Sequence, residues 1–265
     1  MITKKIGVIG FGNMASAIIT GALKKGVLAA SNISTYDISS EATDRAKKLG
    51  IHVAKDNTEV IKNADIILLA TKPQYTEDVF ANCGKIDADK LFLSIVAGIT
   101  SERLFAMMDV RPRLIRIMPN TPALVNEGAY GIAPYENATE EDKKEVAEIF
   151  SSIGVVEWIS ESLIDVVTGL SGGGPAYVAV FIEALADGAV KMGLPRKTAY
   201  RLAAQTCLGT AKMILDEDMH PGVLKDGVTS PGGTTMAGLQ ALEDGAFRGT
   251  VMDCVTAATE KSKSL

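Results

Sequence analysis

A short apolar run that leads directly into a glycine-rich turn constrains the fold of this chain more than any other feature. Residues 5–9 form the apolar run, and a helical pattern follows the turn and stops at Gly26. The turn itself reads Gly10-Phe11-Gly12-Asn13-Met14-Ala15. Gly10 permits a tight turn, Gly12 lets a pyrophosphate approach the backbone, and Ala15 keeps the helix close to its strand. The pattern predicts the strand, turn and helix of a dinucleotide-binding domain.

Further segments of strand length follow within the first 164 residues. The run over 64–70 is continuously apolar without alternation, and 91–96 repeats this form. Such runs are typical of strands that a parallel sheet buries on both faces. The other expected elements are strands over 32–36 and 113–118, an edge strand over 155–159 and an exposed helix over 140–150. We therefore predict an α/β Rossmann domain with a mostly parallel, doubly wound sheet for residues 1–164.

Three of these strands end in small, proline or polar residues. Their tips read Ala70-Thr71-Lys72-Pro73, Ala97-Gly98 and Pro119-Asn120-Thr121-Pro122. Ligands of open α/β sheets lie at the carboxyl ends of the strands, so these tips are candidates for cofactor and substrate contact. Asn120 could present both a donor and an acceptor to a ligand, although turn chemistry alone also favours asparagine at such a position.

Asp37 follows the second expected strand, where an acidic residue hydrogen-bonds the ribose hydroxyls of NAD and disfavours a 2′-phosphate. Ser39 and Ser40 come next and could donate to a phosphate, but no arginine stands at the turn to hold one. A second interpretation makes Asp37 the N-cap of a helix over 41–49. The residues therefore leave the choice between NADH and NADPH open.

The chain changes character at Asp165. From there on it consists of long helical patterns rich in Ala, Leu, Met and Gly, which predicts an all-α second domain over 165–265. Pro175 is expected at the first position of a helix that Gly193 closes. Further helices are expected over 195–216 and 246–264.

The helix over 176–192 is apolar around most of its circumference. Such a helix must be covered on several sides, and a domain of about a hundred residues can hardly do this alone. We therefore expect an obligate homo-oligomer, with a central bundle helix as the alternative.

The stretch 224–243 contains a helix start suited to an anion. Ser230 is a candidate N-cap, Pro231 suits the first helical position, and two glycines leave the backbone open. Unpaired N–H groups and the positive end of the helix dipole favour a carboxylate or phosphate there. The hydroxyls of Thr234 and Thr235 lie alongside. A capped surface helix is the plainer interpretation.

Composition narrows the classes of function. The net charge of −5 and the pI near 5.2 argue against nucleic acid as a partner. The three cysteines are odd in number and widely spaced, as expected for thiols in a reducing cytoplasm, and the two histidines stand alone, so no metal site is expected. We expect no signal peptide and no membrane-spanning stretch. Without a catalytic triad, a paired cysteine or a carboxylate pair, the chemistry must come from a cofactor.

Five motifs resemble, in order, those of the pyrroline-5-carboxylate reductase family. They are Gly10–Ala15, Ala70–Pro73, Met118–Pro122, Leu170–Tyr177 and Val228–Thr235. The resemblance implies a Rossmann domain, a helical dimerisation domain whose helices interlock between subunits, and often a ring of dimers that forms a decamer. It also implies that NADPH, or sometimes NADH, reduces the ring C=N bond of 1-pyrroline-5-carboxylate to L-proline, the last step of proline biosynthesis.

The resemblance also assigns roles to single residues. The pyrophosphate would lie on Ile9, Gly10, Phe11, Gly12, Asn13 and Met14, with Asp37 and Asn57 near the adenosine ribose. The path to the nicotinamide would be lined by Ala70, Thr71, Lys72, Pro73, Ile95, Val96 and Ala97. The substrate would contact Asn120, Glu161, Ser230, Gly232, Gly233, Thr234 and Thr235, some of them across a dimer. Thr235 would hydrogen-bond the ring nitrogen. The family often carries a small hydroxyl residue at the position of Asp37.

Two other functions are compatible with the same architecture. A β-hydroxyacid dehydrogenase should carry a lysine shortly after the glycines that open the interdomain helix, but Tyr177 and Val178 occupy that region. Without this lysine, oxidation of an alcohol would lack its base. A protein that senses NAD(P) without consuming it is the second alternative, and it would leave reduced nicotinamide unconsumed.

Overall fold

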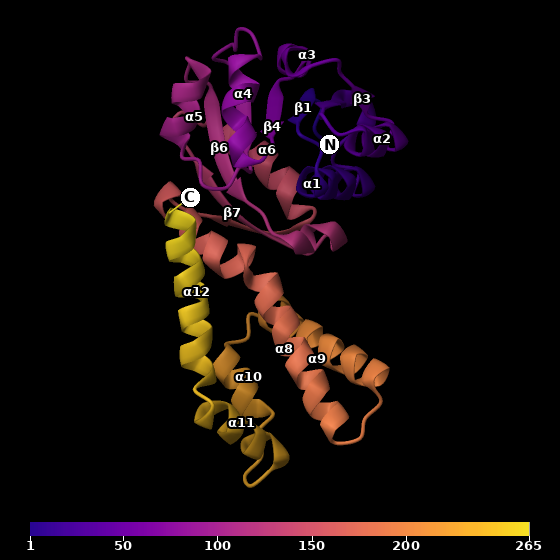
Figure 1. Ribbon diagram of the computed structural model, residues 1–265, viewed down its shortest axis with the longest axis vertical. Coiled ribbons are helices and arrows are strands. Elements are labelled where there is room, and N and C mark those ends of the chain that lie inside the picture. The colour runs from indigo at the N-terminus through magenta and orange to yellow at the C-terminus, as the bar shows by residue number, and fades with distance from the viewer. Residues whose placement is uncertain (265) are drawn as a thin grey trace. The chain divides into compact units, whose positions relative to one another are not determined.

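The computed structural model describes residues 1–264 of the 265-residue chain (Figure 1). The chain forms two compact units, one of Met1–Gly173 together with the chain from Ala257 on, and one of Gly174–Thr256. The Ser262 hydroxyl donates to Asp165 Oδ1 at 2.6 Å, which joins the end of the chain to the first unit. The domain division expected after residue 164 stays a prediction, and residues 165–173 fall in the unit that contains the sheet.

The first unit is built on one eight-stranded sheet with the order β3-β2-β1-β4-β5-β6-β7-β8. The strands are β1 Ile6–Ile9, β2 Ile33–Tyr36, β3 His52–Val53, β4 Ile66–Leu69, β5 Leu91–Ser94, β6 Arg113–Met118, β7 Gly128–Pro134 and β8 Gly154–Trp158. The pairs from β3 through β6 are parallel, whereas β7 runs antiparallel to β6 and parallel to β8. The predicted Rossmann architecture is confirmed. Its strand order reverses between β1 and β4, where such folds bind their ligands.

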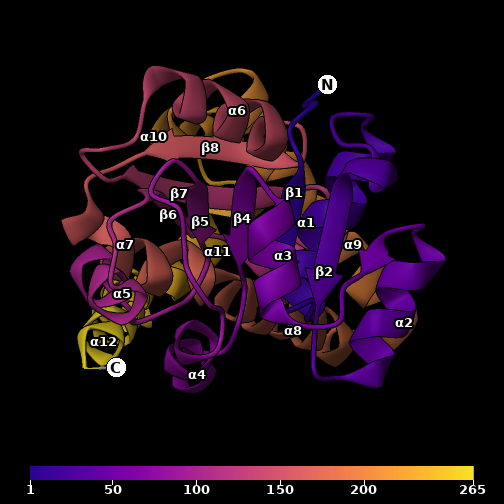
Figure 2. The same cartoon turned by 90° about the horizontal axis from the view of Figure 1, so that it is seen from above.

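Helices cover both faces of this sheet (Figure 2). They are α1 Asn13–Lys24, α2 Ser40–Lys48, α3 Asn57–Asn63, α4 Thr76–Ala81, α5 Ser101–Met108 and α6 Glu140–Ser151. Neighbouring strand residues alternate between two cores. Leu68 packs with the core that α1 and α6 cover, whereas Leu69 packs with the core beneath α3, α4 and α5. This double burial explains why β4 is a continuously apolar segment.

The expectations missed two strands, β3 and β7. The sequence of β7 is Gly-Ala-Tyr-Gly-Ile-Ala-Pro, in which glycines and a terminal proline weaken the strand signal. Tyr130 and Ile132 nevertheless alternate along it and are fully buried. Pairing with β6 and β8 therefore decides this segment, since its local propensity is low.

The second unit is helical. Its helices are α8 Gly174–Lys191, α9 Arg196–Asp216, α10 Pro221–Gly227, α11 Thr234–Asp244 and most of α12 Phe247–Lys263. No strand occurs over 165–264, as predicted.

Helix α8 begins at Gly174, so Pro175 is its second residue, one position later than expected. Helical backbone begins earlier, with α7 Ile164–Val167, and passes through a π-helical turn over Thr168–Gly172 into α8. Pro175 has no N–H to donate to the carbonyl of Ser171, four residues back. The Asn120 side chain donates to that carbonyl instead, at 3.1 Å, so the proline is tolerated inside the helical run.

One helix in the described part of the chain, Glu161–Lys191, is long and apolar enough to cross a membrane by length and composition. We expected no stretch of the chain to be long and apolar enough to cross a membrane, and this expectation is wrong by that criterion. Ala186 is the only buried residue of α8, all of which is described. A large exposed apolar face of this kind is equally typical of a protein–protein interface.

Candidate cofactor and substrate sites

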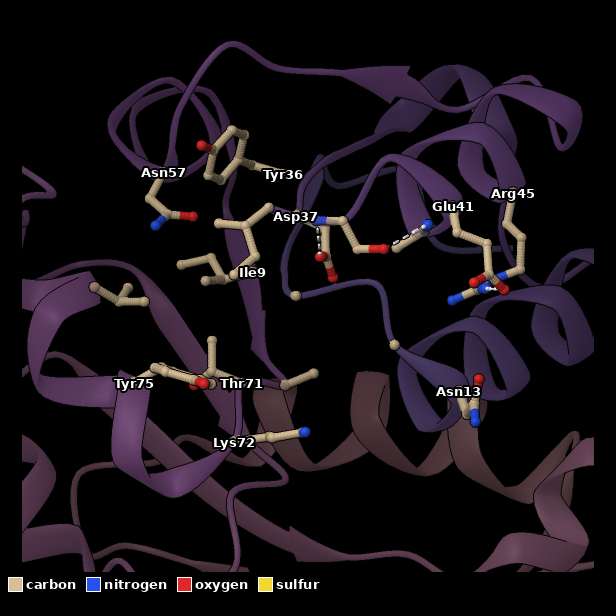
Figure 3. Close-up of a pocket in the computed structure, with 17 residues that line it drawn as sticks. Ile9, Asn13, Tyr36, Asp37, Glu41, Arg45, Asn57, Thr71, Lys72 and Tyr75 are labelled. Atoms are coloured by element: carbon tan, nitrogen blue, oxygen red, sulfur yellow. Dashed lines mark hydrogen bonds and ion pairs between the residues drawn. The ribbon is translucent and has the colours of Figure 1, made fainter.

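A cavity of about 570 Å³ lies at the reversal of the sheet order (Figure 3). It is lined by the turn after β1, the end of β2, the start of α2 and the end of β4. Nine residues predicted to bind the cofactor line it together: Ile9, Gly10, Gly12, Asn13, Asp37, Asn57, Ala70, Thr71 and Lys72.

The glycine turn leaves room for a phosphate. Gly10 has φ +85°, and a Cβ there would lie 2.9 Å from the carbonyl oxygen of Ala70. Gly12 is the N-cap of α1, and a Cβ on it would meet no described atom within 4 Å. No side chain of residues 1–264 caps α1, so its first N–H groups are available to an anion. The helix begins at Asn13, earlier than expected, because the turn leads straight into it.

Asp37 ties the end of β2 to this turn. Its Oδ2 accepts from the Phe11 N–H at 2.6 Å, and its Oδ1 accepts from the Ser39 N–H at 2.8 Å. The interpretation of Asp37 as a helix cap is wrong, because Ser39 caps α2 by accepting from the Ala42 N–H. A carboxylate oxygen has a second lone pair, so Asp37 can still accept a ribose hydroxyl.

Arg45 was missed, because the expectation considered an arginine only at the turn itself. Helix α2 brings Arg45 back to the cavity, where Nη2 donates to the Phe11 carbonyl at 3.1 Å and Nη1 pairs with Glu41 at 2.7 Å. The sequence did contain a signal for the ion pair, because Glu41 and Arg45 are spaced i, i+4 on an expected helix. The other missed lining residues are Tyr36, Ile38, Glu41, Ala42, Tyr75 and Val79.

Two buried polar atoms of the lining have no partner among the described residues. They are Arg45 Nε, a donor, and Asn57 Oδ1, an acceptor. Buried polar groups are nearly always satisfied, and an exception indicates a ligand or an ordered water. Together with the open glycine turn, these atoms fit a nucleotide whose phosphates lie on α1 and whose adenosine end lies near α2 and α3.

The other predicted cofactor residues are not in the lining. The side chain of Phe11 is fully buried, and Val96 is buried in the core under α3, α4 and α5. The remaining four are Met14, Pro73, Ile95 and Ala97. Their roles stay predictions.

Glu161 and Asn120, both predicted to contact substrate, are bonded within the first unit. Glu161 Oε1 accepts from the Ser101 N–H at 2.7 Å and from Arg116 Nη1 at 2.8 Å. Asn120 donates to Ser171 and accepts from the Ala129 N–H at 2.9 Å. Substrate contact by either residue stays a prediction.

The expected helix start in the second unit lies further along the chain. Pro231 does not begin α11, because Gly232 has φ +67° and the Gly233 N–H donates to the Ser230 carbonyl at 3.0 Å, which closes a turn. Helix α11 begins at Thr234 with Gly233 as N-cap, and no described side chain caps it. Thr234 and Thr235 are exposed in its first turn. Anion binding by this stretch stays a prediction, and both glycines lie before the helix.

Cys83 is buried, and burial raises the pKa of its thiol, which favours the unreactive protonated form. Residues 1–264 contain no group of three or more His, Cys, Asp or Glu side chains that could hold a metal ion.

The chain is similar to known reductases along its whole length. The family model described as pyrroline-5-carboxylate reductase dimerisation matches residues 161–265, and the one described as NADP oxidoreductase coenzyme F420-dependent matches residues 5–98. The pyrroline-5-carboxylate reductase of Methanosarcina acetivorans is 47% identical, with 100% of this chain and 99% of that protein covered.

Two solved structures agree with this similarity. The Plasmodium falciparum pyrroline carboxylate reductase with NADP bound has a TM-score of 0.88 and 37% identity, with 100% of this chain and 98% of that chain covered. The Coxiella burnetii pyrroline-5-carboxylate reductase has a TM-score of 0.93 and 34% identity, with 99% and 98% covered.

Proposed function

The chain belongs to the pyrroline-5-carboxylate reductase family, and we propose that it performs the reaction of that family with a nicotinamide cofactor bound at the turn between β1 and α1. It is an NAD(P)H-dependent oxidoreductase of proline biosynthesis, which reduces the C=N bond of 1-pyrroline-5-carboxylate to L-proline. The main support is the 47% identity to the Methanosarcina acetivorans reductase. The matched region covers the whole chain, so it includes both the glycine turn and the Val228–Thr235 motif.

The reduced nicotinamide, when bound, supplies a hydride that C5 of the pyrroline ring accepts. The ring carbon is most electrophilic as the protonated iminium, so orientation of the ring matters more than a protein acid. In this proposal Thr235 hydrogen-bonds the ring nitrogen, and the N–H groups at the start of α11 hold the substrate carboxylate, with Ser230 and Thr234 beside it. Gly232 and Gly233 keep side chains away from that carboxylate.

We propose NADPH as the main cofactor, with NADH also accepted. The match to an NADP oxidoreductase model and the similarity to a structure with NADP bound support NADPH. Asp37 favours NADH instead, because a carboxylate repels a 2′-phosphate and accepts from a 2′-hydroxyl.

The region 161–265 is a dimerisation domain by its family model. We propose a homodimer, assembled further into a decameric ring, located in the cytoplasm. The exposed apolar face of α8 supports the dimer, since a second copy would cover it.

The substitution Thr235→Ala tests the role of Thr235. Loss of a hydrogen bond to a charged ring should lower turnover roughly 10- to 100-fold without changing cofactor affinity. Reduced nicotinamide consumption with 1-pyrroline-5-carboxylate is followed by absorbance, and cofactor binding by the fluorescence of the reduced nicotinamide. Thr235→Ser, which keeps the hydroxyl, serves as the matched control.

Unchanged turnover in Thr235→Ala would show that another group binds the ring nitrogen. The wild-type assay also separates the two alternative functions. A sensor protein would bind cofactor without consuming it, and a β-hydroxyacid dehydrogenase would consume oxidised cofactor with hydroxy acids instead.

A further inference from the structure

We propose that the Glu41–Arg45 pair sets the preference between NADPH and NADH, with Arg45 as the group that binds a ribose 2′-phosphate and Glu41 as its competitor. The inference rests on the proposed position of the cofactor in the cavity of Figure 3. It concerns affinity for the adenosine end of the nucleotide and is independent of the chemistry at the ring.

Arg45 and Asp37 hold the same residue of the glycine turn. Asp37 accepts from the N–H of Phe11 at 2.6 Å, and Arg45 donates to its carbonyl at 3.1 Å. Both side chains therefore lie beside the turn that would hold the pyrophosphate, at the end of the cavity formed by β2 and α2. The 2′ position of the adenosine ribose lies at this end in dinucleotide-binding domains.

Arg45 has spare capacity to donate. Its Nη atoms are used by Phe11 and Glu41, but its Nε is buried without a partner among the described residues. A guanidinium binds phosphate through several N–H groups in a fixed fork, so a phosphate would find donors here that the protein alone leaves unused.

Glu41 opposes such binding. Its carboxylate accepts from Arg45 Nη1 at 2.7 Å, and Asp37 is a second carboxylate in the lining of the same cavity. A 2′-phosphate must therefore compete for Arg45 and meet two negative charges, whereas a 2′-hydroxyl meets an acceptor in Asp37. The other cation of the lining, Lys72, comes from the chain after β4.

The ion pair between Glu41 and Arg45 can separate. The Glu41 side chain is 85% exposed and that of Arg45 is 32% exposed. Solvent screens an exposed ion pair of this kind, so separating the two side chains costs little. A bound phosphate can therefore displace Glu41 into solvent, whereas Arg45 remains attached to Phe11.

Equilibrium binding of NADPH and NADH, together with competition by 2′,5′-ADP and 5′-ADP, tests the proposal. Glu41→Gln should raise affinity for NADPH and 2′,5′-ADP about 3- to 10-fold and change that for NADH and 5′-ADP less than about twofold. Arg45→Gln should lower affinity for the two ligands with a 2′-phosphate, NADPH and 2′,5′-ADP, about 10-fold. Arg45→Lys should lower it less, because lysine keeps the positive charge.

The double variant and a control make the result decisive. In the Arg45→Gln background, Glu41→Gln should no longer raise affinity for 2′,5′-ADP. Glu140→Gln, which removes a similarly exposed carboxylate from a helical pair with Lys143 on α6, should change neither affinity.

An equal effect of Glu41→Gln on both ligand classes, no effect, or the same gain without Arg45 would overturn the proposal. In each of these cases the wild type still binds nucleotide, and the cofactor site stands. If the wild type binds none of the four ligands, the proposed cofactor position itself is wrong, and this inference falls with it.

Discussion

Asn120 shows how one amide can join three parts of the chain. It follows β6, donates from Nδ2 to Ser171 in the helical run, and accepts at Oδ1 from the N–H of Ala129 in β7. It is 8% exposed. The carbonyl of Ser171 needs this donor because Pro175 cannot supply one. A mainly structural role therefore explains the residue without a ligand.

Asn120→Asp should lower the free energy of unfolding by about 1 to 3 kcal/mol, because a carboxylate cannot donate to the Ser171 carbonyl and is repelled by it. Urea denaturation measures this change. Asn63→Asp, at the exposed end of α3, should be within about 0.5 kcal/mol of wild type. A variant at 120 with wild-type stability and a raised KM for 1-pyrroline-5-carboxylate would instead support substrate contact.

Helix α6 depends on a buried acidic cap. Thr139 and Asp142 form a capping box, in which each side chain accepts from the backbone N–H of the other. Asp142 is fully buried and also pairs with Arg113 at the start of β6. One carboxylate thus caps the helix and joins it to the central sheet.

Asp142→Ala should lower the free energy of unfolding by about 3 to 5 kcal/mol, since it leaves the partly buried Arg113 without its carboxylate partner and removes a cap. Asp56→Ala removes a simple cap of α3, where the side chain accepts from the Glu59 N–H, and should cost only about 1 kcal/mol. Denaturant unfolding of the two variants compares them directly. Equal losses would show that the pair with Arg113 adds nothing.

At the scale of the whole molecule, the second unit has too little core for a single chain. On α8 and directly after it, Val178, Val180 and Met192 are 50%, 65% and 84% exposed. Apolar side chains on one helix are rarely left in water, and the helix lies in the region matched by a dimerisation model. A subunit interface would account for the apolar length that satisfies a membrane criterion.

Val180→Glu should therefore weaken assembly. We expect a smaller mass in sedimentation at low micromolar concentration and a melting temperature that depends more steeply on protein concentration than that of wild type. Glu183→Gln, a substitution at an exposed polar position of the same helix, should leave both unchanged. A wild-type protein that sediments as a monomer at all concentrations would contradict the dimer.

Local patterns were sufficient for the features that depend on neighbours along the chain. The glycine turn, the doubly buried strands such as β4 and the helical second half follow from backbone freedom and hydrophobic period, which are properties of consecutive residues. A helix start within 224–243 was predicted for the same reason. Its first residue was wrong, because Gly232 turns the chain before the helix begins.

The tertiary structure alone decided which distant residues meet. Arg45 reaches the carbonyl of Phe11, Glu161 reaches Arg116, and β7 pairs with strands on both sides despite a weak signal of its own. Each of these contacts joins residues far apart in the sequence, and sheet order and helix packing bring them together. The Rossmann fold could therefore be predicted from the sequence, whereas the position of Arg45 and Glu41 beside the glycine turn required the folded chain.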